Sequence, residues 1–155
     1  MSRTLIAGFG NVLRGDDGFG VEVIRRLEGV SLGNGVQLLE VGTGGFHLAH
    51  ELLGIYDRLV IVDAMTRGEP PGSLYIVEVT DVNVVPTVDM HSTVPAQALG
   101  WAKALGVLPP HVVIVGCEPG RVDDLSTVLS DPVAAAADIA VRRIGELLAE
   151  QSTHA

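Results

Sequence analysis

The stretch TLIAGFGNVLRGDDGFGVEVIRRL, residues 4–27, decides the fold of this chain. It opens with a short apolar run, Thr4 to Ala7, which stops at a glycine-rich turn. Small and apolar residues then recur with the spacing of one helix face, at Gly20, Val23, Ile24 and Leu27. A strand, a glycine loop and a helix in this order predict the first unit of a doubly wound α/β domain.

The same cycle recurs along the rest of the chain. Further strands are predicted at 36–41, 59–64 and 112–115, and further helices around 48–53, around 94–105 and from 131 onward. The segment 73–79 follows Pro70-Pro71-Gly72 with no helix before it, so we expect an antiparallel, hairpin-type edge strand there. The stretch 80–90 is expected to be irregular.

These elements predict one doubly wound, three-layer α/β domain over residues 1–150. Its sheet has five mostly parallel strands and carries helices on both faces, with the antiparallel strand at an edge. The last helix starts where Asp131 can cap it and Pro132 suits its first position. Residues 151–155 have no apolar anchor and are expected to form a disordered tail.

Composition and charge narrow the classes of partner. The 155 residues carry a formal net charge of −9, which repels nucleic-acid phosphates and anionic lipid headgroups. Hydrophobic residues make up 47% but aromatic ones only 4%, as expected for aliphatic strands buried under helices. Cys117 is the lone cysteine and no apolar run reaches the length of a membrane span. We therefore expect a cytoplasmic protein that binds neither nucleic acid nor membrane.

Candidate functional residues gather where the predicted strands end. Asp63 directly follows the apolar run 59–62, where an unpaired buried carboxylate would be costly. It needs a positive partner, either a metal ion or, as a structural alternative, Arg67. Asp17 follows the first strand and His91 precedes the third helix, so both can reach the same edge. Two carboxylates and one imidazole suit a borderline divalent ion and leave positions open for substrate or water.

Simpler explanations exist for the acids of the glycine loop. Asp16 and Asp17 can each cap a helix, and we expect Asp16 to be structural in this way. A dinucleotide site is the other alternative, with Glu40 holding a ribose. Leu13 stands where a third glycine is needed, however, and the two acids would face the pyrophosphate. The sequence therefore disfavours a dinucleotide.

Three further residues invite functional interpretations that we consider weaker. His47 and His50 lie three residues apart on the second predicted helix, where a solvent-exposed face explains them better than a metal site without a third ligand. Cys117 ends a buried strand without a nucleophile-elbow sequence or an evident base, so we expect a small buried residue.

Five motifs then connect the chain to a known family. They are GFGNVLRGDDGFG at 8–20, GTGG at 42–45, VDA at 62–64, a histidine before the third helix, and GCEP at 116–119. With these motifs the chain resembles, nearly end to end, the hydrogenase maturation endopeptidases. That family removes a C-terminal extension from the large subunit of nickel-iron hydrogenases.

The resemblance implies roles for individual residues. Asp17, Asp63 and His91 correspond to the family's metal ligands and are the expected catalytic residues. Supporting roles fall to the neighbouring positions Asp16, Glu40, Gly42 and Thr43. The sequence departs from the family at Glu40-Val41, where aspartate followed by glycine is common, so an assisting role carries over to Glu40 only weakly.

The resemblance also implies the substrate, which is the nickel-iron hydrogenase large-subunit precursor. Nickel is expected to arrive already inserted in that precursor, and another divalent ion can occupy the site in the isolated protein. Polarisation of the scissile carbonyl by the metal and activation of water by a carboxylate such as Asp17 are both chemically open. A nickel chaperone without protease activity would need the same ligands and is the alternative function.

Overall fold

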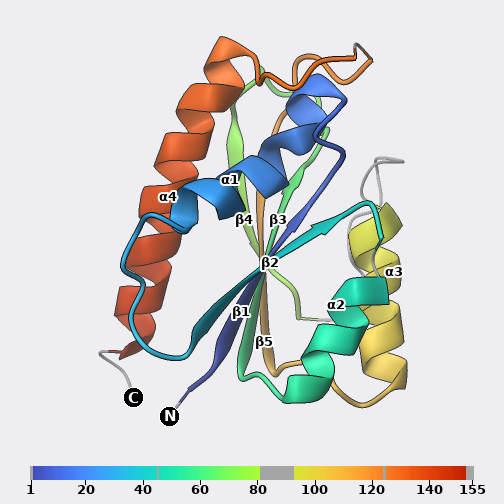
Figure 1. The fold of residues 1–155 in the computed structure, drawn as a ribbon, viewed down its shortest axis with the longest axis vertical. Helices are drawn as coiled ribbons and strands as arrows, with labels where there is room; N and C mark the ends of the chain where they lie inside the picture. Colours follow the sequence, from blue (N-terminus) through green and yellow to red (C-terminus); the bar gives the residue numbers. More distant parts are fainter. Residues whose placement is uncertain (1, 45, 81–92, 124, 153–155) are drawn as a thin grey trace.

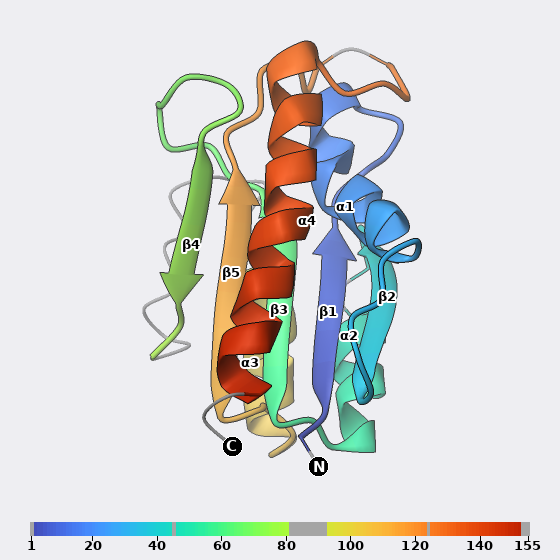
Figure 2. The same cartoon turned by 90° about the vertical axis from the view of Figure 1, so that its left-hand side faces the viewer.

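The computed structural model describes residues 2–44, 46–80, 93–123 and 125–152, and contains one five-stranded sheet. The strand order is β2-β1-β3-β5-β4. The bounds are Thr4–Phe9 for β1, Val36–Gly42 for β2, Arg58–Ala64 for β3, Leu74–Glu78 for β4 and His111–Cys117 for β5. Figure 2 shows the strands in this order behind a long helix, with β4 pointing opposite to its neighbour β5. The predicted antiparallel edge strand is confirmed.

Helices cover both faces of the sheet (Figure 1). Helices α1 (Phe19–Leu27) and α4 (Asp131–Ser152) lie on one face, and α2 (Phe46–Glu51) and α3 (Thr93–Ala104) lie on the other. Short 3-10 turns, η1 at Gly15–Gly18 and η2 at Leu52–Gly54, precede α1 and follow α2. The predicted three-layer α/β architecture is therefore confirmed.

Strands β1 and β3 are buried on both of their faces. Along β1, Leu5 and Ala7 point into the core under α2 and α3, whereas Ile6 points into the core under α1 and α4. In β3, Ile61 and Val62 divide between the two cores in the same way. Side chains alternate along a strand, so a continuous aliphatic run is what a strand covered on both sides requires.

Helix α1 packs unusually close to the sheet. A Cβ added to Gly8 would overlap the carbonyl oxygen of Gly20, and one added to Gly20 would overlap that of Phe9. These two glycines let the first strand and its following helix touch through their backbones. The loop between them, residues 10–18, is thereby held at the carboxyl end of β1.

Helix α4 extends to Ser152, two residues into the segment predicted as a tail. Residues 153–155, and the stretch 81–92 that contains most of the predicted irregular segment, lie outside the described residues. Within the described ranges, no helix is both long enough and apolar enough to span a bilayer.

Candidate active site

Asp17 is anchored inside the glycine loop. Its Oδ2 accepts a hydrogen bond from the backbone N–H of Asn11 at 2.9 Å, and only 7% of the residue is exposed. Gly10, with φ +122°, makes this arrangement possible, because a Cβ there would overlap the backbone carbonyl oxygen of Asp17. The loop therefore folds back until its second acid lies against its first residues.

Asp63 approaches the same place from β3. It is 3% exposed, and its Oδ1 accepts a hydrogen bond from the N–H of Ala64 at 2.9 Å. That oxygen lies 3.7 Å from where a Cβ on Gly10 would stand. Asp63 and the anchored turn carrying Asp17 thus flank Gly10 at the carboxyl ends of two adjacent parallel strands. Arg67, the structural alternative as partner of Asp63, is exposed and instead lies over the ring of Tyr75, 5.1 Å from its centroid.

His91 lies outside the described residues. Helix α3 begins two residues later, at Thr93, and is followed through a short connection by the start of β5. The amino end of α3 consequently points toward the edge at which the parallel strands end (Figure 1). Among the residues that the structure describes, no three His, Cys, Asp or Glu side chains are grouped to hold a metal. The three-ligand set stays a prediction.

Asp16, next to Asp17, faces the opposite way. It is fully buried, and its carboxylate accepts hydrogen bonds from the N–H groups of Gly120, Arg121 and Ser130 and from the Ser130 hydroxyl, at 2.7 to 2.8 Å. Burial by itself would raise the pKa of Asp16, but these hydrogen bonds hold that pKa below its ordinary value. The expected capping role is wrong, because α1 has Gly18 as its N-cap and no side-chain capping bond. The long-range partners could not be inferred from local sequence.

The supporting residues on β2 divide into two groups. Gly42, at φ +67°, accepts a hydrogen bond from the N–H of Gly10 at 2.9 Å, and the pairing register shifts so that Val41 bulges. The end of β2 therefore braces the glycine loop directly. Glu40 is exposed and forms an ion pair with Arg25 of α1 at 3.2 Å. Thr43 is exposed just beyond the strand.

Cys117 does not have the environment of a nucleophile. It is fully buried, and burial, followed by the nearby Asp16 charge, raises the pKa of its thiol to about 12. The prediction of a small buried residue is confirmed. His47 and His50 are both exposed, as their solvent-face interpretation requires.

Glu118 is a buried acid whose role the sequence did not reveal, although the GCEP motif contains it. It is 3% exposed, and its Oε1 accepts hydrogen bonds from Arg67 N–H, Glu69 N–H and the Tyr75 hydroxyl, at 2.8, 3.1 and 2.5 Å. Burial would raise the pKa of Glu118, yet the hydrogen bonds, led by that of Tyr75, keep the pKa below its ordinary value. Glu118 thereby ties the loop after β3 to the start of β4 and the end of β5.

The residues before α1 disfavour a pyrophosphate at the start of this helix. The 3-10 turn η1 directly precedes the helix and contains both Asp16 and Asp17. A phosphate at a helix start needs free N–H groups and no adjacent negative charge. The loop geometry and charge therefore argue against a dinucleotide at this position.

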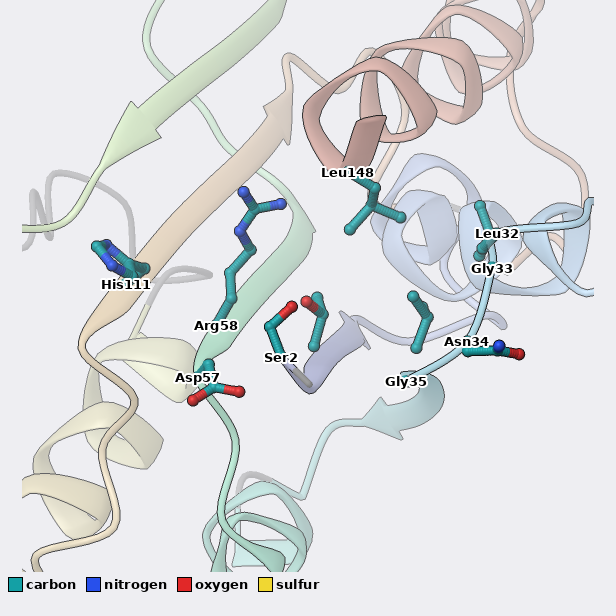
Figure 3. A pocket seen from close by; sticks show the side chains of 11 residues that line it. Ser2, Leu32, Gly33, Asn34, Gly35, Asp57, Arg58, His111 and Leu148 are labelled. Carbon is teal, nitrogen blue, oxygen red and sulfur yellow. The ribbon is translucent and has the colours of Figure 1, made fainter. Parts of the chain in front are cut away.

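A cavity of about 190 Å³ opens at the opposite edge of the sheet (Figure 3). Its lining includes Ser2, Asp57, Arg58 and His111, which lie at or beside the starts of β1, β3 and β5. Arg58 is 6% exposed and donates to the carbonyl oxygen of Leu147 near the end of α4 at 3.2 Å. Burial lowers the pKa of Arg58, while Glu150 opposes that change. Arg58 thus ties the start of β3 to α4, and the cavity lies at the edge of the sheet opposite to Asp17 and Asp63.

Comparison with known proteins relates the whole domain to one group. The family model described as hydrogenase maturation protease matches residues 21–147. The hydrogenase expression/formation protein HupD of Bradyrhizobium diazoefficiens is 31% identical over 153 residues, which cover 94% of this chain and 79% of HupD. HoxM of Cupriavidus necator is 35% identical over 145 residues, covering 91% of this chain and 71% of HoxM.

The fold comparison agrees with the sequence comparison. The hydrogenase maturating endopeptidase HybD from E. coli superimposes with a TM-score of 0.85 at 27% identity, over 96% of this chain and 93% of HybD. Its agreement extends through the sheet, including the antiparallel strand, and through the surrounding helices. On the family match, the relatives and the shared fold, this chain belongs to the hydrogenase maturation protease family.

Proposed function

We propose that this protein is an endopeptidase that removes the C-terminal extension of the nickel-iron hydrogenase large-subunit precursor after nickel insertion. The observation that supports the proposal most directly is the approach of Asp63 and the Asp17 turn to Gly10 at the carboxyl edge of the sheet. That edge is where α/β domains of this topology bind their ligands. Family membership supplies the class of reaction.

The proposed ligands for the precursor's nickel are Asp17, Asp63 and His91. Nickel is then part of the substrate, and the protein recognises the bound nickel before it cleaves the precursor. Carboxylate and imidazole groups are suitable donors for such a divalent ion. The two acids are held by backbone N–H groups, so little side-chain freedom is lost when they bind. In the isolated protein another divalent ion is expected to bind the same groups.

The chemistry of peptide hydrolysis needs one proton acceptor at this edge. Water attacks the scissile carbonyl carbon while a carboxylate takes its proton, and the same proton then passes to the leaving amine. Asp17 suits this role because the Asn11 N–H orients its carboxylate. The metal, when bound, can polarise the carbonyl oxygen.

The proposed cellular compartment and the expected partners agree with the charge and the cysteine of the chain. The precursor is a protein, and the chain's net charge of −9 gives no reason to expect nucleic acid or anionic membrane as a further partner. The free, buried thiol of Cys117 is compatible with a reducing compartment, so we propose that the protein acts in the cytoplasm.

Intact-mass measurement of a nickel-loaded precursor, before and after incubation with the protein, tests the proposal. We expect the precursor to lose the mass of its C-terminal extension, and a metal-free precursor to stay intact. A complex that forms without any change in precursor mass would instead identify a chaperone without protease activity.

The residue assignment has its own test. Asp17→Asn, Asp63→Asn and His91→Ala should each leave a folded protein that does not process the nickel-loaded precursor. Asp123→Asn is the matched control, since the Asp123 side chain is 96% exposed and outside the proposed site. Normal processing by Asp63→Asn or His91→Ala would refute the ligand assignment while leaving the protease activity itself intact.

A further inference from the structure

The two acids of the turn η1, Asp16 and Asp17, hold it to two different segments. Asp17 is bonded to the glycine loop through Asn11, whereas Asp16 is bonded to the segment between β5 and α4. Successive residues of a 3-10 turn are about 120° apart around its axis, so neighbouring side chains leave in different directions. Two adjacent acids with the same chemistry are therefore committed to two different parts of the molecule.

The bonding between the turn and the β5–α4 segment is reciprocal. Besides accepting through its carboxylate, Asp16 donates its own N–H to the carbonyl oxygen of Arg121 at 2.6 Å. Gly15 donates to the carbonyl oxygen of Ser126 at 2.8 Å, while Ser126 donates back to Leu13 at 2.9 Å. The two segments lie together at the top of the molecule in Figure 1. The turn cannot rotate without breaking several of these bonds.

Close packing leaves the turn little freedom to adjust. A Cβ on Gly120 would lie 3.2 Å from Oδ2 of Asp16, and a Cβ on Gly15 would lie 2.5 Å from the Arg121 carbonyl oxygen. Asp16 is also fully buried, and losing one of its donors would leave part of a buried carboxylate without a hydrogen bond. Any rearrangement that satisfies Asp16 differently moves the residue that follows it.

We infer that Asp16 and Ser130 are positioning residues, which fix the direction of the Asp17 carboxylate by clamping the acidic turn to the β5–α4 segment. Ser130 supplies two of the four donors, one from its backbone and one from its hydroxyl. The inference rests on the proposed function of Asp17, and adds that the segment before α4 controls how this acid meets the substrate.

Ser130→Ala is the mildest test, because it removes one hydroxyl and keeps the backbone donor. Ser130→Thr retains a hydroxyl and should behave as wild type. Thr127→Ala is the matched control: it removes a hydroxyl from an exposed residue of the same segment. Asp16→Asn is the stronger variant, because an amide turns one accepting oxygen into a donor that faces other donors.

Two measurements test whether Asp16 and Ser130 position the Asp17 carboxylate. Under single-turnover conditions with nickel-loaded precursor, Ser130→Ala should lower the maximal rate constant on the order of tenfold, because the Asp17 carboxylate is misplaced relative to the scissile bond. Hydrogen exchange at the Asn11 amide, which is bonded to Asp17, should accelerate about tenfold in Ser130→Ala and stay unchanged in Thr127→Ala.

The outcomes separate the inference from the proposed function. Wild-type maximal rate and wild-type Asn11 exchange in both Ser130→Ala and Asp16→Asn would overturn the inference, whatever their melting temperatures, and would leave the protease proposal standing. An inactive wild-type protein would overturn the protease proposal. In that case Asn11 exchange still decides whether Asp16 and Ser130 hold the turn.

Discussion

Gly10→Ala should be far more damaging than a glycine-to-alanine change at another position of positive φ. Gly10 has φ +122° and Gly33 has φ +90°, so alanine at either position adopts backbone angles that cost about 1–3 kcal/mol. A Cβ on Gly33 has nothing within 4 Å, whereas one on Gly10 overlaps the carbonyl oxygen of Asp17. Relieving such overlap typically costs a further ~1–3 kcal/mol.

Urea unfolding of both variants measures this difference. We expect Gly10→Ala to lose at least about 1 kcal/mol more unfolding free energy than Gly33→Ala, or about 2–4 °C more in melting temperature for a chain of this size. The folded fraction of Gly10→Ala should also process precursor poorly, because the added methyl group displaces the backbone of Asp17. Equal unfolding free energies for the two variants, within error, would refute the close approach of the turn to Gly10.

Three other predictions concern buried groups. The Cys117 thiol should not react with Ellman's reagent in the native protein at pH 8 and should react after unfolding, because its pKa is raised to about 12 and it is fully buried; rapid native labelling would contradict this. In the folded protein the pKa values of Asp16 and Glu118 lie below their ordinary values of 3.8 and 4.5. The stability that the two carboxylates contribute is therefore complete above the ordinary pKa values, and it is lost as the pH falls through the lower pKa values of the folded state. The urea concentration at the unfolding midpoint should therefore decrease when the pH is lowered below about 4.5. Glu118→Gln should make this decrease smaller. Tyr75→Phe removes one hydrogen bond to a buried carboxylate and should cost about 1.5–3 kcal/mol by urea unfolding, with an unchanged free energy arguing against the bond.

The candidate site was partly predictable, because the topology of a parallel sheet decides at which edge its strands end. Asp17 follows β1 and Asp63 lies near the end of β3, and the carboxyl ends of two strands that pair in parallel must lie at one edge. The apolar run before Asp63 also indicated a buried carboxylate. The third proposed ligand, His91, was inferred from its position before a helix and from the family resemblance, and the described residues do not test it.

The partner of Glu40 could not be predicted from its position in the sequence. The family resemblance weakly suggested an assisting role for Glu40 beside the acids, but its side chain forms an ion pair with Arg25 on α1. Strand position fixes the edge that a residue occupies, while the choice of partner depends on which helix covers that face. Glu118 is the opposite case, since its three donors come from a loop and a strand more than forty residues earlier.

The sequence by itself determined the order of strands and helices along the chain, the antiparallel edge strand and the edge at which the candidate acids gather. Each of these depends on local apolar runs, on helical periodicity and on chain direction, which are properties of neighbouring residues. Only the tertiary structure decided that Asp16 and Asp17 serve different neighbours. The partners of Asp16 lie more than one hundred residues away along the chain, and only packing brings Gly120 and Ser130 to it.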